Sequence, residues 1–126
     1  MDTDEARRIV DVYVDAWNEP FADERGRMLA QAMIEQSRYV DPNVECESRC
    51  ALDEYIGQVL ARHPGRRIVL ISEVDVHHSC GRFHWQLVRA DGTRGQESVD
   101  FVEFAGDGRI ARVTGFFGPL APSDVR

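Results

Sequence analysis

Apolar side chains recur at helical spacing in the first part of the chain. The spacing predicts a helix over residues 6–19, ended by Pro20, and Asp2 followed three residues later by Glu5 resembles its capping box. The apolar stripe of this helix consists of Ile9, Val12, Tyr13, Ala16 and Trp17. A second, short helix is predicted after a cap at Asp23, and the residues it would bury are Met28, Leu29 and Met33.

A strand and a third helix are predicted next. The strand covers residues 34–41 and ends at Asp41, because Pro42 has no N–H to donate to a sheet. The helix covers residues 51–65, where Pro64 and Gly65 end it. Its apolar stripe consists of Leu52, Tyr55, Ile56, Val59 and Leu60.

From residue 67 onward the apolar pattern changes to a period of two. Four segments, within residues 66–78, 82–90, 96–105 and 109–118, alternate in the way that strands do. Asp91-Gly92 and Asp107-Gly108 are typical of tight hairpin turns. Helices followed by an antiparallel meander predict an α+β fold, in which a curved sheet folds over the helices. Its concave face must be filled either by the helices or by a ligand.

Composition narrows the class of protein. A chain of 126 residues is expected to form one domain, residues 1–126. The net charge of −7 argues against nucleic acid as a partner, and the absence of lysine excludes Schiff-base catalysis. The charged segment 1–8 and the lack of a long apolar run predict no leader and no membrane contact. We therefore expect a cytoplasmic protein with Cys46, Cys50 and Cys80 as free thiols.

Metal and nucleophile chemistry find little support in the sequence. Cys46 and Cys50 are spaced more loosely than a structural zinc pair, and no second pair completes them. His77 and His78 are adjacent on a predicted strand and would point to opposite faces. No Gly-x-Ser-x-Gly elbow and no glycine-rich phosphate loop is present. We expect neither a metal nor a cofactor.

General acid–base chemistry is better supported. Asp41 is the last residue of a strand, and Pro42 biases its backbone toward an extended conformation. Asp100 alternates with apolar residues, and burial there would raise its pKa. Two carboxyl groups in different environments can supply one pocket with an acid and a base. The alternative for Asp100 is a structural ion pair with Arg82 or Arg112, and the alternative for Tyr13 is plain core packing.

The order of these segments resembles the nuclear transport factor 2-like superfamily, also called SnoaL-like. The resemblance runs from about Glu5 to Pro119 and rests on "YVDAWN", "YVDP", "ALDEYI", "FHWQL" and "VDFVEFAGDGRIARVTGFFG". It implies a cone-shaped α+β barrel, in which a strongly bent antiparallel sheet wraps around three helices. It also implies a homodimer that forms through the outer face of the sheet.

Within that superfamily, three residues match the ketosteroid isomerases. The family uses a Tyr on the first helix, an Asp before Pro, and an Asp on the penultimate strand, matched here by Tyr13, Asp41 and Asp100. The resemblance implies that Asp41 is the base, while Tyr13 and a neutral Asp100 stabilise an enolate. Tyr39, on the same strand face as Asp41, would narrow a steroid-sized cleft, and Ser48 replaces the glycine usual before the third helix.

Dehydratases and cyclases of the superfamily suggest another arrangement, with His78 or His84 as the proton shuttle. Our function hypothesis is a cofactor-free isomerase, dehydratase or cyclase that acts on a small hydrophobic carbonyl compound. The alternatives are a non-catalytic dimer that binds a hydrophobic ligand or a protein partner, and a pure assembly domain. With Asp41, Tyr13, Asp100 and His84 as the catalytic set, the expected pocket lining is Trp17, Tyr39, Tyr55, His78, Trp85, Val113 and Phe117.

Overall fold

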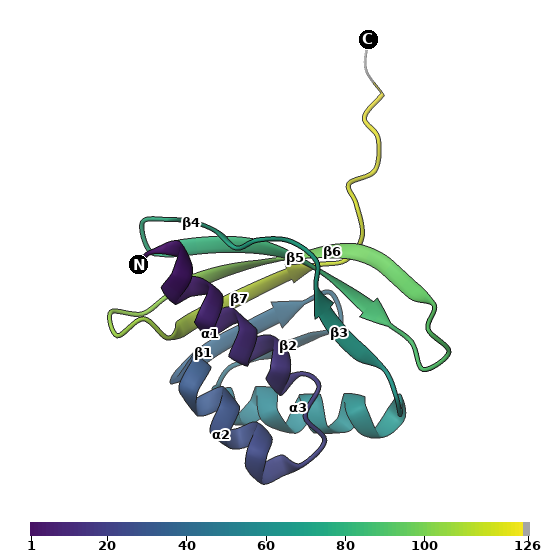
Figure 1. Cartoon of the computed structure of the whole chain (residues 1–126), viewed down its shortest axis with the longest axis horizontal. Helices are drawn as coiled ribbons and strands as arrows, with labels where there is room; N and C mark the ends of the chain where they lie inside the picture. Colours follow the sequence, from purple (N-terminus) through teal and green to yellow (C-terminus); the bar gives the residue numbers. More distant parts are fainter. Residues whose placement is uncertain (125–126) are drawn as a thin grey trace.

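The structure is a computed structural model that describes residues 1–124. This part of the chain contains three helices and seven strands. The predicted α+β class is confirmed (Figure 1). The last two residues of the expected domain 1–126 lie outside the described residues. The helices are α1 (Thr3–Ala16), α2 (Ala22–Ala32) and α3 (Arg49–Arg62). The strands are β1 (Met33–Asp41), β2 (Val44–Cys46), β3 (Arg67–Leu70), β4 (Asp75–His77), β5 (Cys80–Val88), β6 (Arg94–Phe104) and β7 (Ile110–Phe116).

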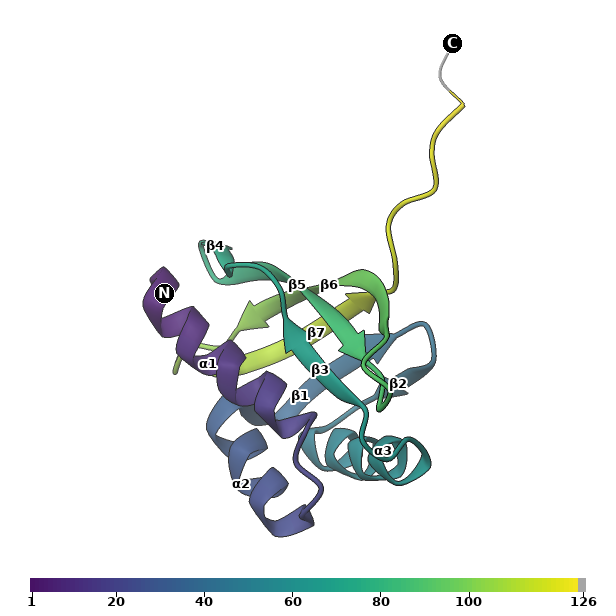
Figure 2. The same cartoon turned by 45° about the vertical axis from the view of Figure 1, so that its right-hand side comes forward.

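All seven strands belong to one curved sheet. The strand order is β2-β1-β7-β6-β5-β3 (Figures 1 and 2). Strand β4 pairs with the same edge of β5 as β3 does. The sheet is not entirely antiparallel as predicted, because β1 and β7 pair in parallel, with Tyr39 opposite Val113. Both strands start at the same end of the sheet, where Met33 lies opposite Ile110. This parallel pair brings the end of β1, which carries Asp41, beside the end of β7.

The helix ends show where local sequence signals determine structure. Asp2 caps α1 as predicted, since its Oδ1 accepts a hydrogen bond of 2.8 Å from the N–H of Glu5. The predicted Asp23 cap of α2 is wrong, because the helix begins at Ala22 and Asp23 lies inside its first turn. An acidic residue there still interacts favourably with the helix dipole. Met33 is buried as predicted, but as the first residue of β1.

The strand pattern after residue 66 is also refined. The first predicted strand is divided into β3 and β4 by an irregular stretch, residues 71–74. The two expected hairpin turns are present, and Gly92 and Gly108 adopt φ of 88° and 89°, which glycine allows without steric cost. Antiparallel β5, β6 and β7 therefore form the meander that the period of two predicted.

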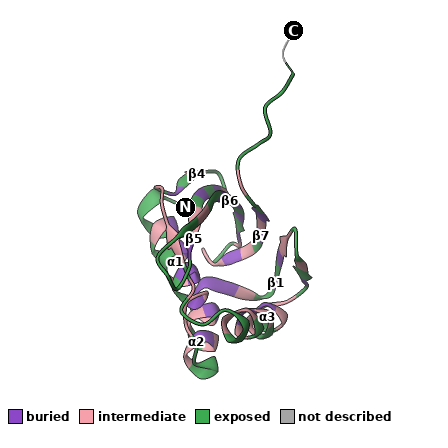
Figure 3. Cartoon of the chain, turned by 90° about the vertical axis from the view of Figure 1, so that its right-hand side faces the viewer, coloured by how far each residue is buried: buried purple, intermediate pink, exposed green. Residues whose placement is uncertain are grey.

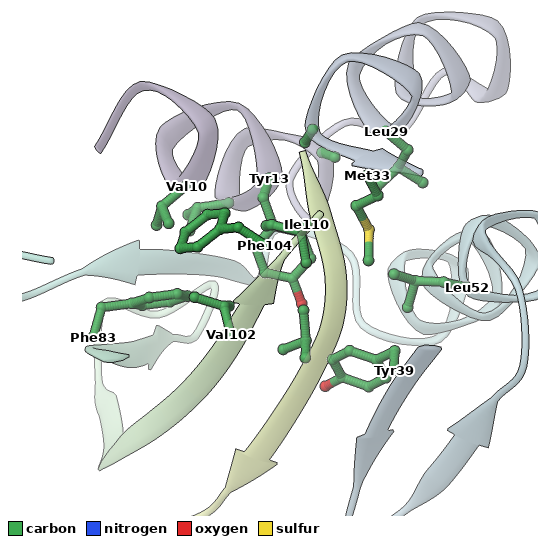
Figure 4. Packing of buried hydrophobic residues seen from close by; sticks show 14 of the residues in the cluster. Val10, Tyr13, Leu29, Met33, Tyr39, Leu52, Phe83, Val102, Phe104 and Ile110 are labelled. Carbon is green, nitrogen blue, oxygen red and sulfur yellow. The ribbon is translucent and has the colours of Figure 1, made fainter. Parts of the chain in front are cut away.

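The core lies between the helices and the concave face of the sheet. Tyr13 from α1, Leu29 from α2 and Leu52 from α3 pack with Phe83 and Ile110 of the sheet (Figure 4). Along β5, β6 and β7, buried residues alternate with more exposed ones (Figure 3). Among residues 1–124, no helix is long and apolar enough to cross a membrane. The core fills only part of the concavity, and the remainder is open.

Candidate active site

The open part of the concave face is a cavity of about 450 Å³. This volume lies within the range of small-molecule sites. Its wall comes from α1, β1, α3, β3, β5, β6 and the residues that follow β7. The lining residues are Tyr13, Trp17, Tyr39, Asp41, Asn43, Tyr55, Val59, Arg66, Ile68, Phe83, Trp85, Leu87, Arg89, Gly95, Gln96, Ser98, Asp100 and Phe117. The cavity therefore contains the three residues Tyr13, Asp41 and Asp100.

Asp41 lies at the cavity wall with its carboxylate held in place by three donors. Its Oδ1 accepts hydrogen bonds from the backbone N–H groups of Asn43, at 2.7 Å, and Val44, at 3.1 Å. Its Oδ2 accepts from the hydroxyl of Tyr39 at 2.5 Å. Pro42 has no N–H to donate. The turn after it instead directs the N–H groups of Asn43 and Val44 toward the carboxylate of Asp41, as is common for Asp in turns. The orientation of the carboxylate is thus set by the strand end and the turn.

Asp100 occupies a much drier position on β6, opposite Phe83 of β5 and Gly115 of β7. It is only 5% exposed, and its Oδ1 accepts a hydrogen bond of 3.0 Å from the indole N–H of Trp85. Burial raises the pKa of Asp100 to about 7; the Trp85 hydrogen bond opposes the rise and the charge of Asp41 adds to it. Near neutral pH, a substantial fraction of this carboxyl group therefore carries a proton.

Among residues 1–124, no arginine forms an ion pair with Asp100. The two arginines considered as its partners pair instead with other carboxylates: Arg82 with Asp75 at 2.9 Å, and Arg112 with Glu103 at 3.8 Å. The structural ion-pair alternative for Asp100 is therefore wrong. Its carboxyl group is left facing the cavity, with the indole of Trp85 as its hydrogen-bond donor.

Gly115 of β7 lets the two carboxyl groups share one space. A Cβ atom at this position would meet Asp100 Oδ1 at 2.8 Å and Asp41 Cβ at 3.4 Å. The first distance is shorter than real Cβ atoms show, so any larger residue would displace Asp100. The parallel pairing of β1 with β7 and the antiparallel pairing of β7 with β6 thus bring Asp41 and Asp100 to opposite sides of a single glycine.

Tyr13 reaches the same region from α1. Its side chain is 1% exposed, and its hydroxyl oxygen has no hydrogen-bond partner within residues 1–124. Burial raises the pKa of Tyr13 well above its ordinary value, and the charge of Asp100 contributes in the same direction. Burial also raises the pKa of Tyr39. Both phenols remain protonated near neutral pH, and the hydroxyl of Tyr13 is available to donate to a ligand in the cavity.

Aromatic rings form the apolar wall. Trp17 of α1 contacts Tyr39 and Tyr55, with ring centroids 5.4 and 6.2 Å apart. Trp85 meets Phe117 edge to face, with centroids 5.8 Å apart. All five of these residues were predicted pocket residues, and the structure places them on the cavity wall. Together with Tyr13 they supply much of the apolar surface of the cavity, as aromatic side chains do in most sites for small ligands.

Three predicted site residues lie elsewhere. His84 is exposed on the outer face of β5, because neighbouring strand residues point to opposite faces and Trp85 points inward. His78 is exposed in the turn between β4 and β5, where its φ is 53°. Val113 points inward but is fully buried in the core rather than in the cavity. Neither histidine can act as a proton shuttle beside Asp41 in this arrangement.

Several polar lining residues were not predicted. They include Asn43, Arg66, Arg89, Gln96 and Ser98. The alternation of Phe83, Trp85, Leu87 and Arg89 along one face of β5 and its extension is the signal that could have identified Arg89. Arg66 precedes a strand rather than lying within one, so no periodicity marks it.

The cysteines and histidines do not form a metal site. In the described part of the chain, no three side chains among His, Cys, Asp and Glu are grouped so that they could hold a metal ion. Cys46 is buried, Cys50 is exposed, and all three cysteines are free. Cys80 Sγ lies 3.9 Å from the imidazole of His77, outside the cavity.

Solved structures resemble this chain closely. A candidate isomerase of the SnoaL-like family from Agrobacterium tumefaciens is 33% identical, with a TM-score of 0.85 over 91% of this chain and 98% of its own. A candidate SnoaL-like polyketide cyclase from Jannaschia is 15% identical, with a TM-score of 0.64 over 87% of this chain and 85% of its own. A designed NTF2-fold protein is 19% identical, with a TM-score of 0.66 over 94% of this chain and 88% of its own. The last two show the fold alone. No protein-family model and no curated protein matches the chain.

Proposed function

Because the chain belongs to the SnoaL-like family of the nuclear transport factor 2-like superfamily, we propose that it is a cofactor-free enzyme. Its reaction moves or removes a proton next to a carbonyl group in a small hydrophobic compound. One observation carries the proposal: Tyr13, Asp41 and Asp100 all line a single aromatic-walled cavity, and Gly115 separates the two carboxyl groups. A ligand that contacts one of these groups has the others within reach.

Each of the three residues has a distinct role in the proposed step. The Asp41 carboxylate takes a proton from the carbon next to the carbonyl, and the electrons of that C–H bond move onto the carbonyl oxygen as an enolate. The phenol of Tyr13 and the protonated carboxyl of Asp100 donate hydrogen bonds to this oxygen. The Trp85 hydrogen bond orients Asp100, and the Asn43, Val44 and Tyr39 donors orient Asp41.

The enolate has two productive fates. It takes the proton back from Asp41 at a different carbon, which is an isomerisation, or it attacks a second carbonyl carbon, which closes a ring. The names of the Agrobacterium and Jannaschia proteins, an isomerase and a polyketide cyclase, correspond to these two outcomes. The chain is therefore proposed as an isomerase or cyclase of unassigned substrate. If the enolate instead expels a hydroxyl group from the β-carbon, which leaves with a proton as water while a C=C bond forms, the enzyme is a dehydratase.

Proton exchange tests the proposal without knowledge of the substrate. In deuterated buffer at pH 6.5, the protein is expected to accelerate deuterium incorporation into the methyl group of 2-acetylnaphthalene, measured by NMR. Asp41→Asn should reduce the acceleration at least ~100-fold, the usual contribution of a general base. Binding of the ketone, followed by quenching of Trp17 and Trp85 fluorescence, should be retained because both rings line the cavity.

The matched control is Asp75→Asn, which removes one exposed carboxylate outside the cavity. This variant should exchange as fast as the wild type. Undiminished exchange in Asp41→Asn would refute Asp41 as the base. Binding by the wild-type protein with no acceleration of exchange would contradict the enzyme proposal and favour a non-catalytic ligand-binding protein.

A further inference from the structure

Two arginines line the end of the cavity that lies away from the carboxyl groups. Arg66 directly precedes β3, and Arg89 directly follows β5. These two strands pair antiparallel, with Arg67 opposite Val88, so Arg66 and Arg89 emerge at the same end of the pair. Both side chains line the cavity, and Gln96 lies on the wall with them.

The charges of Arg66 and Arg89 are not neutralised by ion pairs. Seven other arginines pair with Asp or Glu, whereas neither Arg66 nor Arg89 does so among residues 1–124. Burial lowers the pKa of Arg66, and the charge of Arg89 acts in the same direction. The pKa of Asp91, an exposed turn residue, is lowered mainly by its hydrogen bonds from Thr93 and, to a smaller extent, by the charge of Arg89. Arg66 and Arg89 thus place two positive charges on the cavity wall of a chain whose net charge is −7.

The cavity therefore has two chemically different ends. Asp100 on β6 lies opposite Phe83 on β5. Arg89 follows Phe83 by six residues along the chain, which corresponds to about 20 Å at the rise per residue of a strand. The side chains of Trp85 and Leu87 line the cavity between these points. Tyr55 of α3 lines the cavity from the helix side. Along its length, the cavity thus has the carboxyl groups at one end, apolar side chains in the middle and the two arginines at the other end.

We propose that the substrate is an elongated keto acid whose carboxylate binds Arg66 and Arg89 while its carbonyl group lies between Asp41, Asp100 and Tyr13. The placement of the carbonyl rests on the proposed function, whereas the recognition of the anion by the two arginines does not. Guanidinium groups bind carboxylates through parallel hydrogen bonds and prefer them strongly over neutral amides. The apolar wall accepts the hydrocarbon part of the molecule.

A pair of probes isolates the contribution of the charge. The first is 4′-acetylbiphenyl-4-carboxylate, which has a methyl ketone at one end and a carboxylate at the other. The second is its primary amide, which has almost the same shape and no charge. Titrations followed by calorimetry at low salt should show the acid binding at least ~tenfold more tightly than the amide, and 0.5 M NaCl should reduce the difference by screening the charges.

The decisive variant is the double substitution Arg66→Gln/Arg89→Gln. It should bring the affinity for the acid down to that for the amide and leave the affinity for the amide unchanged. The matched control Arg8→Gln/Arg67→Gln removes the same number of charges from exposed positions outside the cavity and should keep the preference. Equal affinities of the wild type for both probes, or a preference that survives the Arg66/Arg89 substitutions, would overturn the inference.

Exchange of the acetyl protons separates this inference from the proposed function. A wild-type protein that prefers the acid but does not accelerate exchange would support the anion site and contradict the enzyme. A protein that accelerates exchange of both probes with equal affinity would support the enzyme and contradict the anion site.

Discussion

Asp41 and Asp100 are the same kind of residue in two different environments. Asp41 is half-buried at a strand end, and three donors surround its carboxylate. Asp100 is buried on a central strand. Within residues 1–124, its carboxyl group accepts a hydrogen bond from the indole N–H of Trp85. Desolvation penalises the charged form, so Asp100 retains a proton at a pH where an ordinary Asp has lost it. The pocket thereby gains both an acceptor and a donor from one residue type.

The raised pKa of Asp100 predicts a specific pH dependence of stability. In the unfolded chain an Asp loses its proton near pH 4, whereas folded Asp100 keeps its proton up to about pH 7. Folding stability therefore falls as the pH rises from 4 to 7, by an amount on the order of 4 kcal/mol, and is level above that. Asp100→Asn has no such charge to lose. Its free energy of unfolding in urea should exceed that of the wild type at pH 8 and match it at pH 4.

The same variant should alter the pH profile of activity. Wild-type exchange should fall as the pH rises through 7, because Asp100 then loses the proton that it donates. The Asn side chain still donates above pH 7, so the profile of Asp100→Asn should be flat there. A stability difference of the same size at pH 4 and pH 8 would show instead that the substitution acts through packing.

Sequence reasoning identified single residues where a local signal was present. Asp41 was marked by the proline behind it and Asp100 by strand alternation. The hydrogen bond between Trp85 and Asp100 was not predictable, since it depends on the register that places Trp85 opposite Ser98. His84 was selected for its chemistry, although the inward alternation on its strand places Trp85, and not His84, in the cavity.

At the scale of elements, strand periodicity predicted the meander, and caps predicted only some helix ends. α1 begins after its predicted cap, Asp2, whereas α3 begins after Ser48, two residues before its predicted start at residue 51. The side chains of Asp2 and Ser48 each accept a hydrogen bond from a backbone N–H one turn into the helix. α2 has no side-chain cap, so its start could not be located from an Asp alone. The parallel pairing of β1 with β7 joins segments from opposite ends of the sequence. No local pattern specifies such a pairing.

The outer face of β6 and β7 carries two large exposed aromatic residues. Phe101 and Phe116 are 44% and 55% exposed and contact each other edge to face, with centroids 6.1 Å apart. Thr114 lies opposite Phe101, and Val99 lies opposite Phe116. Exposed aromatic clusters of this kind are typical of protein interfaces. We propose that two copies of the chain pair through this face.

Substitution on that face tests the dimer. Phe101→Glu would place a charge in the centre of the proposed contact and should raise the dimer dissociation constant at least ~30-fold, the effect of losing a central aromatic residue. Phe21→Glu, at an exposed position before α2, should have no effect. Sedimentation equilibrium measures both variants. A wild-type protein that stays monomeric at high concentration, or a Phe101→Glu variant that still forms dimers, would contradict the proposal.

For the whole molecule, the change from helical to strand periodicity was enough to predict the α+β class and the concave face. It was not enough to predict how much of the concavity remains open, because that depends on the sum of side-chain volumes from three helices and the sheet. The designed NTF2-fold protein shows that this fold forms without any particular substrate. We therefore propose that function depends on the residues that line the cavity, and above all on Tyr13, Asp41 and Asp100.

The decisive measurement is a crystal structure of the protein at pH 6 with 4′-acetylbiphenyl-4-carboxylate bound. The ketone oxygen is expected to lie about 2.7–3.1 Å from Tyr13 Oη and from the Asp100 carboxyl group, the distance typical of oxyanion donors. The methyl carbon should contact the Asp41 carboxylate, and the ligand carboxylate should lie against Arg66 and Arg89. A ligand bound in the reverse direction, or outside the cavity, would contradict this expectation.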